Sequence, residues 1–260
     1  MDGDGSIQVN HWRKRCLQFR RNIKLKYTPA NFSMLKKIAT VIGGNVKIVG
    51  TNKWVLWVEN DTKKIFKLTE ILKDYPPRTT QLQCQLAFLN SCLIQKDVVW
   101  YLQHRDFKYA SRSNKLAIRT NCNITQLSYF PAWLSGFREA ESCFCVRNTN
   151  NNHSFSISQQ YDFYLIEAIK LYFGAFNKIQ HKKDNLYLLE IYRKQCLKLI
   201  YNHCRNNPLL GEKHQSFLEF YSVIHFLVSC CLATVRTGLF SVTLMTHKHT
   251  QHFIYVCFLF

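Results

Sequence analysis

The chain has 260 residues, which is enough for one large core or for two domains of ordinary size. Its formal net charge of +19 and sequence pI near 9.6 favour a polyanionic partner, either nucleic acid or an anionic membrane. Eleven cysteines, an odd number, without a signal peptide or a Cys-x-x-Cys pair, argue against a secreted disulfide framework and favour a reducing compartment.

The positive charge is concentrated near the N-terminus. Residues 13–26, "RKRCLQFRRNIKLK", contain seven Lys or Arg and no acid. Ile23 and Leu25 alternate there with Lys24 and Lys26, which predicts a strand with one apolar and one cationic face. An even spread of charge would indicate only a basic soluble protein, whereas this pattern favours nucleic acid. The residues of this segment that we expect to contact DNA are Arg13, Lys14, Arg20, Lys24 and Lys26.

The chain contains an internal repeat. "MDGDGSIQV" at Met1–Val9 matches "REAESCFCV" at Arg138–Val146, and "MLKKIATVIGG" from residue 34 matches "LIEAIKLYFGA" from residue 165. Each copy then continues with a strand, "KWVLWVEN" or "NLYLLEIY", and with two helices, the last being "QLQCQLAFLNSCL" or "EKHQSFLEFYSVI". Both copies are predicted to run α-β-β-α-β-β-α-α, so we expect two homologous α/β halves joined through residues 97–132.

The stretch "WLSGFREAESCF" at residues 133–144 is predicted to be a packing helix. Gly136 and Ala140, two small residues four positions apart, let a second backbone come close. We therefore expect the equivalent helix of the other half to pack there about a pseudo-twofold axis. The residues expected at this interface between the halves are Leu134, Gly136, Phe137 and Ala140.

Such packing would bring together the two acids that end the matched motifs, Asp4 and Glu141. A carboxylate at the C-terminus of a helix is disfavoured by the helix macrodipole, and two carboxylates forced close repel each other. A divalent cation between them removes this repulsion, so the packing helices and a metal site are expected to coincide.

At these residues the chain resembles a known family. "WLSGFREAESCF" resembles the second motif of a LAGLIDADG homing endonuclease, and "DGDGSIQV" resembles the tail of the first, within a likeness that spans roughly residues 1–225. The resemblance implies an α+β fold of two pseudo-twofold-related α-β-β-α-β-β-α halves, each presenting an antiparallel, saddle-shaped sheet to DNA. It also implies a monomeric enzyme, encoded in an intron of a mitochondrion or chloroplast, that hydrolyses both strands of a specific double-stranded DNA site and so promotes intron mobility. The expected division is 1–96 for the first half, 97–132 for a linker, 133–225 for the second half and 226–260 for an atypical apolar tail.

The resemblance also implies roles for individual residues. Asp4 and Glu141 would bind Mg²⁺ (or Mn²⁺), with the backbone carbonyls of Gly3 and Ala140 as further ligands. The catalytic residues would be Asp4, Glu141, Lys213, which offsets transition-state charge, and Gln159, which lies near the water network. The second half would add DNA contacts from Arg147, Ser156 and Ser158.

Three departures from the family pattern affect these expectations. The match to the first motif starts only at Met1, so we expect the start of the first motif helix to be missing. We therefore expect Leu134 and Phe137 to lose apolar partners, and this form to be poorly stable and a weak or inactive nuclease. Ser142 stands where glycine is usual. The place that corresponds to Lys213 holds Gln81 or Leu82, with Arg78 nearby but out of register.

Two alternatives to the nuclease remain. The first is an RNA-splicing maturase, or a non-cleaving nucleic-acid binder, that uses the same fold on intron RNA. The second is a membrane-associated basic protein, since residues 226–245 are apolar except for a central Arg236, but it does not explain the repeat and we expect no membrane partner. His247, His249 and His252 with Cys257 have a loosely metal-like spacing that no second ligand pair completes as a zinc site.

Overall fold

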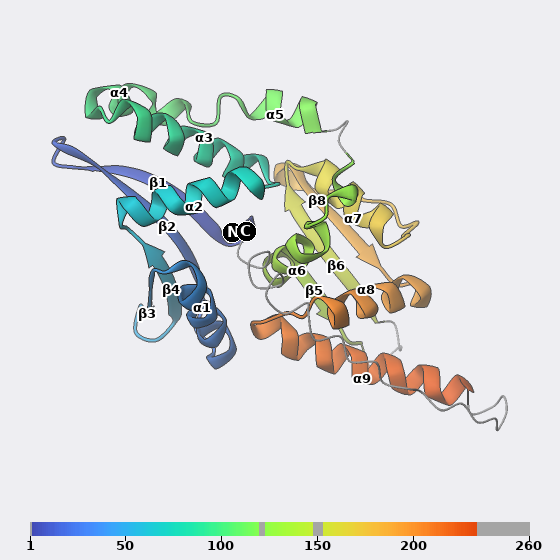
Figure 1. Ribbon diagram of the computed structural model, residues 1–260. Coiled ribbons are helices and arrows are strands. Elements are labelled where there is room, and N and C mark those ends of the chain that lie inside the picture. The colour runs from blue at the N-terminus through green and yellow to red at the C-terminus, as the bar shows by residue number, and fades with distance from the viewer. Residues whose placement is uncertain (1, 120–122, 148–152, 233–260) are drawn as a thin grey trace.

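A computed structural model describes residues 2–119, 123–147 and 153–232. Two four-stranded antiparallel sheets lie side by side, each covered by its own helices (Figure 1). Their strand orders are β1-β2-β4-β3 and β5-β6-β8-β7, so the two sheets share one topology. The prediction of an α+β fold with two homologous halves is confirmed.

The first half contains four strands and three helices. The chain leaves a turn at Asp2–Asp4 and forms a long hairpin whose far tip is Arg13–Arg15. Its elements are β1 (Gly5–Trp12), β2 (Cys16–Lys26), α1 (Pro29–Ile42), β3 (Asn45–Val49), β4 (Trp54–Glu59), α2 (Thr62–Asp74) and α3 (Thr80–Gln95).

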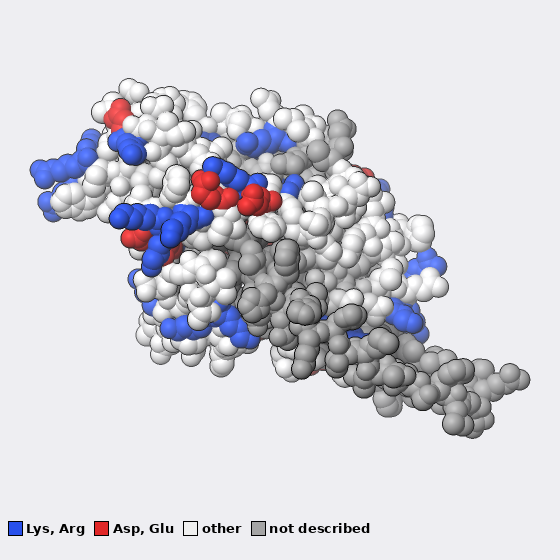
Figure 2. All heavy atoms as spheres, in the orientation of Figure 1, with Lys and Arg blue, Asp and Glu red and all other residues white. Residues whose placement is uncertain are grey.

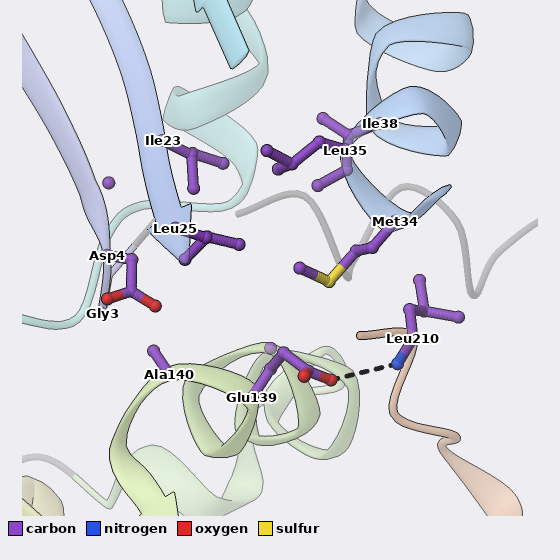
Figure 3. Close-up of a pocket in the computed structure, with 12 residues that line it drawn as sticks. Gly3, Asp4, Ile23, Leu25, Met34, Leu35, Ile38, Glu139, Ala140 and Leu210 are labelled. Carbon is purple, nitrogen blue, oxygen red and sulfur yellow. Dashed lines mark hydrogen bonds between the residues drawn. The ribbon is translucent and has the colours of Figure 1, made fainter. Parts of the chain in front are cut away.

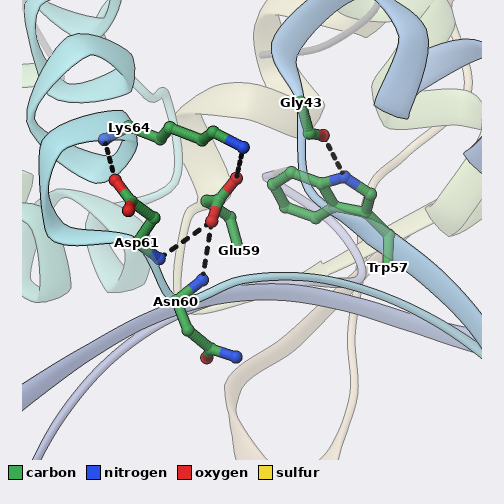
Figure 4. Close-up of polar contacts among 6 residues, drawn as sticks. All are labelled: Gly43, Trp57, Glu59, Asn60, Asp61 and Lys64. Atoms are coloured by element: carbon green, nitrogen blue, oxygen red, sulfur yellow. Dashed lines mark hydrogen bonds and ion pairs between the residues drawn. The ribbon is translucent and has the colours of Figure 1, made fainter.

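Local side-chain contacts fix where the helices of this half begin and end. The Asp61 carboxylate accepts a hydrogen bond from the Lys64 backbone N–H at 2.9 Å and caps α2 (Figure 4). The adjacent Glu59 accepts from the Asn60 and Asp61 N–H groups, and so holds the turn from β4 into α2. The buried Trp57 indole donates to the Gly43 carbonyl at 2.9 Å, which ties the end of α1 to β4.

Two helices and two short 3-10 turns connect the halves. They are α4 (Val98–His104), the turn Arg105–Phe107, α5 (Arg112–Arg119) and the turn Ile124–Gln126.

The second half then contains α6 (Phe130–Glu141), β5 (Ser142–Cys145), β6 (Ser154–Gln160), α7 (Phe163–Tyr172), β7 (Gln180–His181), a turn at Lys183–Asn185, β8 (Leu186–Ile191), α8 (Lys194–Asn206) and α9 (Glu212–Leu232). The α-β-β-α-β-β-α-α order predicted for both copies is confirmed for this second copy. The described part of the first copy starts with a turn and β1, so its order is β-β-α-β-β-α-α and the predicted leading helix is not among the described elements. α6 begins before residue 133, and α9 continues past residue 225.

The apolar side of α6 packs into the core of its own half. Leu134 is 0 % exposed and Phe137 is 2 % exposed, and both lie in one cluster with β6 and α7 residues such as Phe155 and Ile166. The prediction that Leu134 and Phe137 would lose their apolar partners is therefore wrong. The spacing of apolar residues defines one face of a helix, but it does not say whether that face meets the helix's own sheet or a neighbouring half.

The opposite side of α6 faces the first half. Gly136, Glu139 and Ala140 line a small cavity of about 50 Å³ together with first-half residues such as Gly3 and Met34. This side contains the small residues, which agrees with the predicted interface role of Gly136 and Ala140.

Within the described parts of the chain, no helix combines the length and apolar character needed to cross a bilayer. Residues 233–260 lie outside the described residues. They include Arg236, most of the apolar stretch at 226–245 and the predicted His247, His249, His252 and Cys257 group.

Candidate active site

The ends of the two matched motifs meet between the halves. Gly3 and Asp4 lie in the turn before β1, and Ala140 and Glu141 end α6. Figure 3 shows Gly3 and Asp4 directly across from Ala140. A methyl group added to Gly3 would overlap the Ala140 side chain and would lie 3.3 Å from Glu141 Oε1. The close approach therefore requires glycine at residue 3, and it sets the spacing of the two acids.

The electrostatics of the acids reflect this proximity. Burial, followed by the negative charge of Asp4, raises the pKa of Glu141 to about 7, while the charge of Lys213 opposes the rise. Partial burial also raises the pKa of Asp4, and the positive charge of Lys213 opposes this rise. The Asp4 side chain is nevertheless exposed, so it lies in a recess that remains open to solvent. The structure thus brings Asp4, Glu141 and Lys213 together.

The acid pair suits a hard divalent cation. The charge of Asp4 raises the proton affinity of Glu141, and such a pair of carboxylates offers oxygen ligands of the kind that Mg²⁺ prefers. Mg²⁺ commonly binds one or two carboxylates while keeping several waters. In residues 2–119, 123–147 and 153–232, no group of three or more His, Cys, Asp or Glu side chains forms a metal cluster. A cation here would depend on Asp4, Glu141, backbone carbonyls and water.

A polar pocket of about 290 Å³ opens beside Glu141. Its lining includes Gly3, Gln81, Glu141 and Gln159. Gln159 is 9 % exposed at the end of β6, and so the structure places it in the same pocket as Glu141. Gln81 is exposed near the start of α3.

Two further acids in the motifs were not singled out from the sequence. The buried Asp2 carboxylate accepts from the N–H groups of Arg78 and Thr79 at 2.9 and 2.8 Å, at the start of α3. It also accepts from the Trp133 indole of the second half at 2.7 Å.

Glu139 takes the equivalent position in the second half. Its carboxylate accepts from the N–H groups of Leu210, Gly211 and Lys213, each at 3.1 Å, at the start of α9. Figure 3 shows the bond from Leu210. Burial raises the pKa of Glu139, and the three N–H donors oppose the rise. The matched "acid, small residue, acid" pattern of the two copies was the sequence signal for this pair.

Each of these helix starts is also capped from the opposite half. The buried Asp162 of the second half accepts from Thr80 N–H at 3.0 Å and from Thr80 Oγ1 at 2.6 Å. Asn31 of the first half accepts from Glu212 N–H at 3.0 Å. Buried hydrogen bonds that cross between the halves make their relative placement specific.

The cationic face of β2 is present as predicted. Lys24 and Lys26 are exposed, whereas Ile23 lies in the core, and Lys24 Nζ stands 4.8 Å from the centre of the exposed Trp54 ring. Arg20 is exposed too and donates to the Asn60 side chain at 2.9 Å.

The other residues predicted to contact DNA lie on the hairpin tip of the first half and on the strands of the second half. Arg13 and Lys14 form the hairpin tip, with left-handed backbone φ values of 50° and 56°, and Figure 2 shows this tip as a group of basic side chains at the left. Ser156 and Ser158 are half-buried and point away from the core side of β6. Arg147 follows β5 and lies 3.4 Å from Glu190 as an ion pair.

Comparison with known proteins places these features in a wider group. A family model described as "LAGLIDADG endonuclease" matches residues 1–92 and 134–224. A probable intron-encoded endonuclease aI3 from Dictyostelium citrinum is 43 % identical over 224 residues, which is 85 % of this chain and 90 % of the relative. A protein of the same name from Debaryomyces hansenii is 38 % identical over 250 residues, covering 85 % of this chain and only 36 % of that longer protein.

Solved structures resemble the fold at low sequence identity. The LAGLIDADG homing endonuclease I-GzeII, in complex with its DNA target, superposes with a TM-score of 0.66 at 17 % identity, over 90 % of each chain. The LAGLIDADG meganuclease I-AabMI, bound to uncleaved DNA, has a TM-score of 0.64 at 18 % identity, over 88 % of this chain and 89 % of that one.

Proposed function

Because the chain belongs to the LAGLIDADG endonuclease family, we propose that it is a DNA homing endonuclease whose acids Asp4 and Glu141 hold a divalent cation at the junction of the two halves. The observation that carries the proposal is the meeting of these two acids, one from each motif, within reach of the Lys213 charge. An acid pair that is retained in both copies favours cleavage over the maturase alternative.

The substrate in this proposal is double-stranded DNA, and the two sheets are its binding surface. Exposed lysines and arginines on β2 and the hairpin tip would contact phosphates, which positions the duplex without reading its sequence. Ser156 and Ser158 would make polar contacts from the second sheet. The chain would act as a monomer, because both motif acids come from one chain, and its gene would lie in an organellar intron.

Each site residue has a chemical role in hydrolysis. A bound Mg²⁺ or Mn²⁺ would polarise the scissile phosphate and lower the pKa of a nearby water. Asp4 and Glu141, with the carbonyls of Gly3 and Ala140, would fix the position of the cation. Gln159 would orient water in the pocket beside Glu141, and Lys213 would stabilise the negative charge that grows on the phosphoryl oxygens.

The test uses the purified chain and a plasmid that carries the intron-free form of its own insertion site. We expect linear plasmid in the presence of MgCl₂ and none when EDTA replaces it. Cutting in EDTA would contradict the proposed metal site. A plasmid that stays intact under all conditions would contradict the proposed endonuclease activity.

A further inference from the structure

Two leucines lie at equivalent places on the outer faces of the two sheets. Leu56 in β4 and Leu188 in β8 are half-buried, whereas the neighbouring Val55 and Leu189 are fully buried. Side chains alternate between the two faces of a strand, so both leucines point away from the core and toward the proposed DNA side. Among the described residues, neither leucine belongs to the core cluster of its half or to the apolar side chains that pack against that cluster.

In the first half, Leu56 stands between two lysines. It is directly opposite Lys24 in β2 and Lys47 in β3, both of which are exposed, so the three side chains form a row across the outer face of the sheet. Adjacent strands are about 4.8 Å apart, so the two lysines start about 10 Å from each other. The major groove of B-DNA is about 12 Å wide and admits a β-ribbon. Lysines at this spacing can reach phosphates on both rims of the groove while Leu56 faces the edges of the base pairs.

The second half repeats this row with neutral ends. Leu188 is directly opposite Ser158 in β6 and Gln180 in β7. The strand pairing β6-β8-β7 corresponds to β2-β4-β3, so Leu188 takes in its own half the place that Leu56 takes in the first. Both halves therefore have an apolar side chain at this position, although the charge of its neighbours differs.

An apolar side chain has one matching group in the major groove. The base-pair edges present hydrogen-bond donors and acceptors there, together with the 5-methyl group of thymine. Leucine has no donor or acceptor, so against the other bases it would remove water from polar groups without replacing their hydrogen bonds. Against thymine it buries the methyl group, which is favourable.

We propose that Leu56 and Leu188 each contact the 5-methyl group of a thymine, one in each half of the target, and determine a preference for thymine there. Because the two halves are related by a pseudo-twofold axis, the two thymines lie at equal distances on either side of the centre of the site. The proposal rests on the endonuclease function proposed above and adds a feature of the target sequence.

The test uses labelled duplexes of the intron-free insertion site, in which each thymine of either strand is replaced in turn by deoxyuridine. This change removes the methyl group and leaves the hydrogen-bonding groups in place. Binding is titrated in EDTA, because the proposed cleavage needs a divalent cation. We expect one sensitive thymine in each half of the site, at equal distances from its centre, where the Kd rises about fourfold for the loss of one buried methyl group.

The scan separates this proposal from the endonuclease function. A scan without such a pair of thymines, on a site that the chain binds and cuts, would overturn the thymine contacts and leave the nuclease intact. A chain that neither binds nor cuts the unmodified site would overturn the proposed function and the thymine contacts with it.

Substitutions assign each thymine to its leucine. Leu56→Ala should abolish the response to deoxyuridine in one half of the site only, and Leu188→Ala should abolish it in the other half. Leu56→Gln keeps the length of the side chain but not its apolar character, and gives the same test if Leu56→Ala fails to fold. Leu171→Ala should change neither response, since Leu171 is exposed on α7, which packs on the core face of the second sheet. Both responses persisting in a Leu56 variant with parental thermal unfolding would overturn the proposal.

Discussion

Asp2 and Glu139 occupy equivalent positions in the two halves, and each carboxylate binds the backbone N–H groups at the start of the last core helix of its own half. Each also lies two residues before an acid of the candidate metal site, Asp4 or Glu141. The segment that carries the metal ligand is thereby fastened to a helix start in both halves. The same two capping acids thus contribute to stability and to the placement of the site.

Replacing Asp2 should destabilise the protein strongly. Its carboxylate accepts four hydrogen bonds, including the one from Trp133 that crosses to the second half. Asp2→Ala would leave these buried donors without a partner, and we expect a loss of about 2–3 kcal/mol in the free energy of unfolding, measured in urea. Asp61→Ala is the matched control, since Asp61 caps the exposed start of α2 and its removal should cost about 1 kcal/mol. Equal losses for the two variants would contradict a special role for Asp2.

A substitution at Ala140 should relieve the steric clash that a substitution at Gly3 creates. Gly3→Ala would force its new methyl group into the Ala140 side chain, and we expect a loss of about 1–3 kcal/mol in unfolding free energy and a slower cleavage rate. Ala140→Gly removes the clashing atom, so the double variant should recover most of both quantities, although Ala140→Gly alone costs about 1 kcal/mol in a helix. Purely additive losses in the double variant would show that this contact does not set the spacing of the motif ends.

The sequence predicted some of these relationships and could not predict others. The meeting of Asp4 with Glu141 followed from the repeat, because equivalent residues near a pseudo-twofold axis approach each other. The burial of Leu134 in its own half did not follow, because helical spacing identifies a face and not its neighbour. The bond from Asp162 to Thr80 joins segments far apart in the chain, and no local pattern encodes such a pair.

DNA binding should depend on salt and on the cationic face of β2. Lys24→Gln with Lys26→Gln should weaken binding to all duplexes about equally and should reduce the salt slope by about one unit for each lost phosphate contact. Titrations of labelled duplex at several NaCl concentrations measure both effects. Lys63→Gln serves as the control, since Lys63 is exposed on α2, a helix that packs on the sheet from the other side. If Lys63→Gln weakens binding as much as the β2 substitutions, this strand face is not the DNA surface.

Cation binding should depend on pH through Glu141. Its pKa is raised to about 7 by burial and by the charge of Asp4, so below pH 7 the folded protein holds a proton that a bound cation must displace. We expect the apparent affinity for Mn²⁺, measured by calorimetry without DNA, to fall about tenfold per pH unit between pH 7 and pH 5.5 and to level off above pH 7.

The same raised pKa has an opposite effect on the stability of the metal-free protein. The unfolded chain releases this proton near the ordinary glutamate value of 4.5, whereas the folded protein retains it up to about pH 7. The folded state therefore binds more protons across this interval, and the contribution of Glu141 to unfolding free energy falls as the pH rises through it. Glu141→Gln has no proton to release, so it should remove this part of the pH dependence of stability and abolish Mn²⁺ binding and cleavage while DNA binding survives. A Gln variant that still binds Mn²⁺ with the parental pH profile would assign the cation to other ligands.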